Sequence, residues 1–327
     1  MTPVVRVPVS LVRARTRDGV WLDGVMVEPR RRRNVALVWV HGLGSAFASG
    51  QPLVRALSSY LSAAGVAYIK LNTRGHDGVA RAGRRLVGAA FERFGESVRD
   101  IRAAIALARQ AGYPRIVLAG HSTGANKALH YAARIHDRRL IGLILLGPVS
   151  DIAAEMKRVG PRELRRRVAV AERIARRDGS ALVPRAFGFW SAQRYLSLYR
   201  PGGIEDVFPY YRPRARWSAL RGVRLPVAVI IGDRDEYLDR PAAALIDAFA
   251  RNATRGRPFT GIAIPRARHG FQGQEDALSR VIVRWVAGLA ARRSRSRTAR
   301  TATESSGVRL GRTSPRTTRP KSSTIVR

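Results

Sequence analysis

The sequence predicts an α/β fold with a mainly parallel central sheet flanked by helices. Short apolar runs bounded by glycine, proline or polar residues recur along the chain, as is typical of buried parallel strands. Segments with a helical spacing of apolar residues lie between these runs. Strands that alternate with helices favour a parallel sheet joined by right-handed crossovers. At 327 residues the chain is long enough to bury a large core.

The expected strands and helices follow from these patterns in chain order. The first two strands flank an arginine-rich turn that reads PRRRRN. We expect strands at Val20–Val27, Asn34–Val40, Val66–Leu71, Arg115–Ala119, Leu140–Leu146 and Pro226–Ile231, and a last apolar run covers Thr260–Ile264. Two helical stripes are formed by Val98, Ile101, Ile105 and Ala108, and by Leu278, Val281, Ile282, Trp285 and Leu289. These stripes are interpreted as faces that pack on the core.

One segment, about residues 150–221, interrupts the alternation. It contains a candidate amphipathic helix around Leu164–Ile174 and then an irregular stretch with nine aromatic residues between Phe187 and Trp217. An insertion of this kind between two core strands predicts a small helical lid over a pocket. The alternative is that the rings only pack the insertion onto the main domain, and both readings can hold in part.

Composition limits the remaining organisation. We expect one α/β domain over residues 1–290 and a disordered basic tail over residues 291–327, because the tail is rich in Ser, Thr and Arg and has no apolar periodicity. The net charge is +37, yet only four of the 60 basic residues are lysines and the excess is spread along the chain. This pattern indicates a solvated surface, and no specific nucleic-acid partner is expected.

Several protein classes are excluded or disfavoured by the same data. The chain has no cysteine, which excludes disulfides, thiolate metal sites and cysteine nucleophiles. The N-terminal residues lack the apolar core of a signal peptide, and the most apolar stretch, Leu140–Val149, is too short to span a membrane. We therefore expect a cytoplasmic protein without a transmembrane segment. The sequence gives no indication of its oligomeric state.

The stretch Gly120–Gly124 reads GHSTG and has the context of a catalytic turn. It follows the strand expected at Arg115–Ala119 and precedes a helical pattern that starts at Ala125. The pentapeptide alone is weak, since short motifs of this kind also occur in ordinary turns. In a strand–turn–helix context, however, the serine would project above the sheet at a positive helix N-terminus, as in a nucleophile elbow. Ser122 is therefore a candidate nucleophile.

A serine nucleophile needs a base and a carboxylate that orients this base. His269 lies in a loop after the last apolar run, while the other histidines lie upstream or next to the serine. The stretch GDRDEYLD after the strand at Pro226–Ile231 offers Asp233, Asp235, Glu236 and Asp239. Strand alternation cannot choose between Asp233 and Asp235, because they differ by two positions. Asp151 is a further candidate. The chain order Ser122, Asp235, His269 is the order expected for this architecture.

The stretch HGLG, which starts at His41 directly after a strand, is a candidate oxyanion loop. A backbone N–H just after His-Gly, together with that of Thr123, would face a developing oxyanion. His41 is expected to brace this loop, and His121 is expected to form pocket wall or packing.

The chain resembles the α/β-hydrolase superfamily, in particular its lidded serine esterase, lipase and proline-iminopeptidase branch. The resemblance covers about Val20–Ala290 and rests on HGLGS, GHSTG, IIGDRDEYL and ARHGF. LNTRGHD is similar to the family's aspartate-x-arginine-glycine loop, with Asn72 in place of the aspartate. HGLG departs from the HGGG loop of the hormone-sensitive-lipase branch, and serine at the elbow disfavours dehalogenase and epoxide-hydrolase chemistry.

The resemblance implies a fold with a helical lid and assigns roles to residues of this chain. It implies Ser122 as nucleophile, Asp235 as acid, His269 as base, and the amides of Leu43 and Thr123 as oxyanion hole. Arg74, in LNTRGHD, would bind an anionic substrate group or serve a structural role.

The implied chemistry is two-step acyl transfer from a carboxylic ester to Ser122 and then to water, with a peptidase less favoured, and it requires no metal or cofactor. The alternative is a non-hydrolytic protein of the same fold that binds a ligand or associates with nucleic acid.

Overall fold

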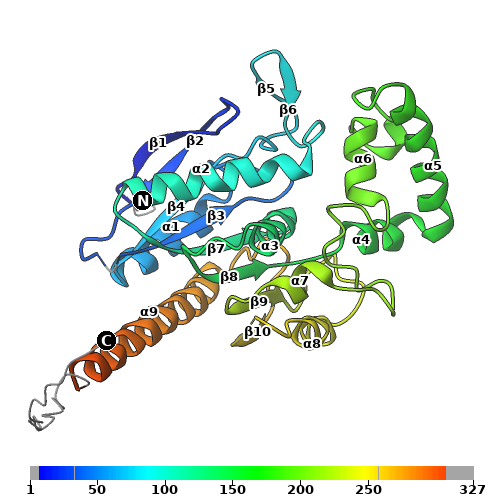
Figure 1. The fold of residues 1–327 in the computed structure, drawn as a ribbon. Helices are drawn as coiled ribbons and strands as arrows, with labels where there is room; N and C mark the ends of the chain where they lie inside the picture. The colour runs from blue at the N-terminus through cyan, green and yellow to red at the C-terminus, as the bar shows by residue number, and fades with distance from the viewer. Residues whose placement is uncertain (1–6, 33, 257, 307–327) are drawn as a thin grey trace, which may run out of the picture. The chain divides into compact units, whose positions relative to one another are not determined.

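The computed structural model describes residues 7–32, 34–256 and 258–306. A central eight-stranded sheet has the order β1-β2-β4-β3-β7-β8-β9-β10 (Figure 1). Strand β1 is antiparallel to β2, β2 is antiparallel to β4, and the other neighbours are parallel. The strands are β1 (Ser10–Arg15), β2 (Trp21–Val27), β3 (Val35–Val40), β4 (Val66–Leu71), β7 (Arg115–His121), β8 (Leu140–Leu146), β9 (Val227–Gly232) and β10 (Phe259–Ile264), and a separate hairpin is formed by β5 (Ala80–Ala82) and β6 (Arg85–Val87).

Helices cover both faces of the sheet. The helices are α1 (Gln51–Ala63), α2 (Ser97–Gln110), α3 (Thr123–Ile135), α4 (Asp151–Val159), α5 (Pro161–Arg177), α6 (Ala192–Tyr199), α7 (Ser218–Gly222), α8 (Ala242–Asn252) and α9 (Glu275–Ser306), with short 3-10 turns at Phe94–Glu96 and Arg185–Phe187. Helices α2, α3, α7 and α8 share one apolar core with alternate strand residues such as Leu143 and Leu145. Gly142 points to the opposite face, where it meets Trp285 and Leu289 of α9. Arg280 of α9 donates to Tyr60 of α1, so these two helices lie together there.

The predicted fold class is confirmed, and every predicted strand is present within two residues of its expected ends. Strand β1 was not predicted. Its sequence, SLVRAR, carries arginine among apolar residues, and all of its side chains except Ala14 are partly or fully exposed at the sheet edge. An edge strand with little buried surface leaves only a weak apolar signal.

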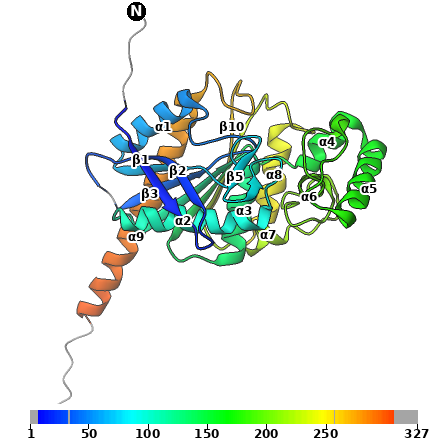
Figure 2. The same cartoon turned by 90° about the horizontal axis from the view of Figure 1, so that it is seen from above.

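The predicted insertion is a helical segment between β8 and β9. Helices α4, α5 and α6 are grouped apart from the sheet, on the side away from β1 (Figures 1 and 2). They have a small core of their own. Of the nine aromatic residues, Phe187 and Tyr195 belong to this small core, while Phe208, Tyr210 and Trp217 belong to the main core. Packing therefore accounts for most of the rings.

The segment from Ala290 onward forms a second unit by itself. Its backbone continues α9 to Ser306, inside the range 291–327 for which the sequence predicts disorder, and residues 307–327 lie outside the described residues. Disorder of the tail stays a prediction. Among the described residues, no helix combines the length and the apolar character that a membrane crossing requires.

Candidate active site

Ser122 occupies the turn between β7 and α3 with a strained backbone. Its φ is 57° and its ψ is −129°, a region that non-glycine residues rarely adopt. Strand β7 ends at His121 and α3 begins at Thr123, so the serine stands alone at the apex of the turn. Strain of this kind at a single polar residue points to a functional site.

The glycines on both sides of Ser122 make this turn sterically feasible. A methyl group at Gly124 would overlap the carbonyl oxygen of Val40, and one at Gly120 would overlap the backbone of Gly124. Helix α3 can therefore approach the end of β3 only because these positions lack a Cβ. The motif GHSTG is thus explained by close packing as well as by its serine.

Asp235 and His269 are joined by a hydrogen bond. His269 Nδ1 lies 2.7 Å from Asp235 Oδ2, and the Asp235 side chain is fully buried. The two loops approach closely because Gly232, at the end of β9, has no side chain where the carbonyl oxygen of Ala267 lies. The other carboxylate oxygen, Oδ1, accepts the N–H of Tyr237 at 3.0 Å, which fixes the carboxylate plane.

The alternative carboxylates are placed differently. Asp233 is exposed, and its backbone N–H donates to the carbonyl of Ile264. Asp151 lies at the start of α4 and has no hydrogen bond to His269 among the described residues. Of the three candidates, only Asp235 contacts the imidazole.

Ser122 and His269 line one cavity of about 710 Å³. Among the described residues, no hydrogen bond joins Ser122 Oγ to His269, so the structure brings these residues to one cavity without the serine–histidine contact. Catalytic hydrogen bonds often tighten only when substrate is bound. The cavity wall consists of Gly42, Leu43, Ser45, His121, Ser122, Thr123, Val149, Asp151, Ala154, Glu155, Lys157, Arg158, Tyr199, Glu236, Tyr237 and His269.

The turn after β3 lies directly against Ser122. A Cβ on Gly42 would be 3.0 Å from the Cβ of Ser122, and Leu43 and Thr123 both line the cavity. In the described part of the chain, neither the Leu43 N–H nor the Thr123 N–H donates to a backbone carbonyl. Two amides beside the serine are therefore available to a negatively charged oxygen.

His41 and His121 support the loops around the cavity. His41 is buried outside the cavity wall and contacts the carbonyl of Gly42 at 2.9 Å. His121 lines the cavity, and its Nε2–H donates to the carbonyl of His269 at 2.8 Å. Burial, reinforced by the nearby His269, lowers the pKa of His121 to about 4. His121 is therefore neutral near pH 7.

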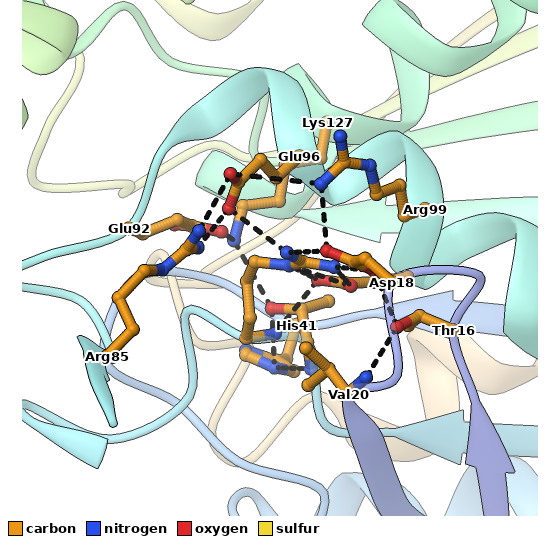
Figure 3. Close-up of polar contacts among 12 residues, drawn as sticks. Thr16, Asp18, Val20, His41, Arg85, Glu92, Glu96, Arg99 and Lys127 are labelled. Carbon is orange, nitrogen blue, oxygen red and sulfur yellow. Dashed lines mark hydrogen bonds and ion pairs between the residues drawn. The ribbon is translucent and has the colours of Figure 1, made fainter. Parts of the chain in front are cut away.

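Arg74 does not line the cavity, contrary to the interpretation that it binds an anionic substrate group. It is absent from the cavity wall, its side chain is 0% exposed, and it pairs with Asp18, Glu96 and Asp100 at 2.7–3.0 Å. Figure 3 shows Asp18, Glu96 and Arg99 of this cluster. A guanidinium held by three carboxylates has no donor left for a substrate anion, so its role is structural.

Sequence reasoning missed several cavity residues. The ring of Tyr237 packs edge-on against His269 with centroids 4.7 Å apart, and Tyr199 comes from α6 of the insertion. Tyr237 lies in the acid loop itself, two residues after Asp235, which was an available signal. Nothing in the spacing of Tyr199 distinguishes it from the aromatic residues that only pack the insertion.

Among the described residues, no group of three or more His, Asp and Glu side chains is arranged to hold a metal ion.

Comparisons with known proteins agree with this architecture. The siderophore hydrolase EstB from Aspergillus fumigatus superposes with a TM-score of 0.62 at 19% identity, covering 86% of this chain and 98% of that one. Est1E from Butyrivibrio proteoclasticus with bound ferulic acid gives 0.61 at 18% identity, with 86% and 99% covered. An esterase from Pyrococcus furiosus gives 0.56 at 15% identity, with 88% and 91% covered.

These likenesses establish the α/β-hydrolase fold, and the structural neighbours are esterases and other hydrolases. No match is found among curated protein sequences. A family described as "Protein of unknown function (DUF1749)" matches residues 25–289.

Proposed function

The chain belongs to the DUF1749 family, and we propose that it is a serine hydrolase that cleaves carboxylic esters through an acyl-enzyme. The observation that carries this proposal is the elbow serine in one cavity with a histidine that is hydrogen-bonded to a buried aspartate. The fold alone hosts many chemistries, so the proposal depends on the site.

The proposal assigns one role to each residue of the site. His269 removes the proton of Ser122 as its Oγ attacks the ester carbonyl, and later gives it to the leaving alcohol. Asp235, bound to Nδ1, fixes the ring, leaves Nε2 available to the serine and stabilises the imidazolium. The N–H groups of Leu43 and Thr123 stabilise the tetrahedral oxyanion. Water then attacks the acyl-enzyme with the same imidazole as base.

The helical insertion is proposed to act as a lid. Helix α4 supplies five residues of the cavity wall, and α6 supplies Tyr199. These residues follow Ser122 by about 30 residues or more in the sequence but line the same cavity. The insertion therefore shapes the space that is open to a substrate. Lys157, on α4, donates to the carbonyls of Glu236 and Leu238, which ties the insertion to the acid loop.

A panel of p-nitrophenyl esters with increasing acyl length, together with aminoacyl p-nitroanilides, tests the reaction class. We expect hydrolysis of esters at rates well above those of the anilides, because an aryl ester has the better leaving group. Ser122→Ala, prepared in parallel, must be inactive and controls for a contaminating esterase. Hydrolysis of neither class by the folded protein would favour a ligand-binding protein of this fold.

We expect the preference for cationic over uncharged esters to depend on pH through the charge of Asp151. Burial, and then the neighbouring Glu205 carboxylate, raise the pKa of Asp151 to about 7, against the opposing effect of Arg194. The carboxyl is neutral below this pH and anionic above it, so it attracts a substrate cation only at the higher pH. We expect the ratio of kcat/KM for a choline ester to that for its uncharged 3,3-dimethylbutyl isostere to rise about fivefold between pH 6 and pH 8.

The ratio removes any effect of pH on the chemical step that is common to both esters. In Asp151→Asn the ratio should stay flat over this range. A rise of equal size in the variant would assign the effect to another titratable group of the cavity wall and contradict the role of Asp151.

A further inference from the structure

A chain of hydrogen bonds runs from the protein interior to the turn after β3, which lies against Ser122. His41 Nδ1 lies 2.9 Å from the carbonyl oxygen of Gly42. His41 Nε2 accepts the backbone N–H of Thr73 at 2.9 Å and lies 3.2 Å from the Thr73 hydroxyl. His41 is only 1% exposed, so water does not compete for these contacts.

The direction of each hydrogen bond follows from the donors available. Because a backbone N–H can only donate, His41 Nε2 is an acceptor and the ring proton is on Nδ1. Nδ1–H therefore donates to the carbonyl of Gly42, and the Thr73 hydroxyl donates to Nε2. Burial, and then the charge of Lys127, lower the pKa of His41 to about 3, so the ring stays neutral with this single proton.

Lys127 stands at the far end of the chain. Its Nζ lies 3.4 Å from Thr73 Oγ1 and 2.6 Å from Glu92 Oε1, and both charged side chains are 0% exposed. Figure 3 shows Lys127 next to Glu92, with His41 nearby. Space for the Glu92 carboxylate exists because Gly75 has no Cβ, which would overlap it.

We propose that Lys127, Thr73 and His41 form a relay that positions and polarises the Gly42–Leu43 peptide, and thereby strengthens the Leu43 N–H as an oxyanion donor. This rests on the proposed function, in which that N–H contacts the oxyanion. All donors point the same way, from Lys127 through Thr73 and His41 to the Gly42 carbonyl. Hydrogen bonds aligned in this way strengthen one another, most of all in a buried setting of low dielectric.

The relay also gives a reason for the buried ion pair. A buried ion pair is no dependable source of stability, because desolvation offsets the attraction of its charges. Lys127 lies on α3, the helix that starts directly after Ser122, and the pair with Glu92 holds its ammonium group beside Thr73, which links that helix through His41 to the oxyanion loop. The three relay residues are positioning residues, since none of them lies in the cavity wall.

Thr73→Val tests the relay with little change in side-chain shape. The variant keeps the Thr73 N–H contact to His41 but removes the hydroxyl between Lys127 and His41. We expect kcat for a good ester to fall about tenfold, less than the 10²–10³-fold cost of deleting an oxyanion donor, with KM changed less than about twofold. The affinity for a trifluoromethyl ketone, which forms a tetrahedral adduct, should fall by the same factor. Thr73→Ser, which restores a hydroxyl, should recover most of both.

Thr16→Val is the matched control. Thr16 is also buried, and its hydroxyl contacts Asp18 and the N–H of Val20 in the adjacent Arg74 cluster without a contact to His41 (Figure 3). We expect a lower melting temperature and an unchanged kcat. An equal loss of kcat in Thr16→Val and Thr73→Val would show that general destabilisation causes the loss, and would overturn the relay.

The double variant Lys127→Met/Glu92→Gln tests the charged end without leaving a lone buried carboxylate. We expect a loss of kcat in the same direction, and no further loss when Thr73→Val is added, because both changes interrupt one chain. Fully additive losses would contradict a single relay.

An NMR readout separates the relay from the proposed function. The Leu43 amide proton should shift upfield in Thr73→Val, as its peptide becomes less polarised, and stay unchanged in Thr16→Val. An unchanged Leu43 shift in Thr73→Val would overturn the relay even in an active enzyme. Absence of ester hydrolysis in the wild type would instead overturn the proposed function, while the Leu43 shift still decides the relay.

Discussion

The Asp235→Asn variant is expected to fold normally and to lose roughly 10³–10⁴-fold in kcat for ester hydrolysis. Asparagine has nearly the shape of aspartate, so it keeps the N–H contact from Tyr237 and the packing of the loop. It removes the charge that stabilises the imidazolium of His269, and its amide favours the wrong ring tautomer. Steady-state kinetics, with circular dichroism as a check of folding, measure this effect.

Asp233→Asn is the matched control, two residues away in the same loop. The Asp233 side chain is exposed and has no contact with His269 among the described residues, so we expect less than about a tenfold loss of kcat. A large loss in Asp233→Asn together with a small one in Asp235→Asn would transfer the acid role to Asp233 and leave Ser122 and His269 in place.

The Arg74→Met variant is expected to lose about 3–5 kcal/mol in the free energy of unfolding. Arg74 neutralises Asp100, which is 1% exposed, and its removal leaves a buried carboxylate without a counter-charge. Its hydrogen bond also holds the pKa of Asp18 well below the usual range. Chemical denaturation measures the loss. The protein that remains folded should keep its kcat and KM, because Arg74 lies outside the cavity wall.

Arg99→Met is the control for this change. Arg99 contacts Asp18 at 2.8 Å in the same cluster, but its side chain is 47% exposed. Exposed ion pairs contribute about 0–1 kcal/mol, so the loss should stay within that range. A raised KM for anionic esters in Arg74→Met, with unchanged stability, would show instead that Arg74 binds the substrate.

The central strands and the order of the site residues could be predicted from the sequence because both leave local signals. Buried parallel strands such as β4 and β8 are continuous apolar runs, and their observed bounds equal the predicted ones. The edge strand β1 leaves no such run, since partial burial permits arginine at alternate positions.

Side-chain contacts between distant segments could not be predicted. The choice between Asp233 and Asp235 depends on which carboxylate reaches a loop 34 residues later. Arg74 was placed near a pocket by its motif, whereas the carboxylates that bind it come from Asp18, Glu96 and Asp100. The relay from Lys127 to Gly42 likewise joins three separate segments, and no spacing pattern in the sequence predicts it.

Labelling with a fluorophosphonate probe, followed by peptide mass spectrometry, tests the central claim most directly. The probe reacts only with a serine that a neighbouring base activates. We expect one adduct, on Ser122, formed rapidly in the wild type and abolished in His269→Ala, while Ser45, another serine of the cavity wall, stays unmodified. Correctly folded protein that shows no adduct on Ser122, or that is labelled equally in His269→Ala, would contradict the assignment of a serine hydrolase.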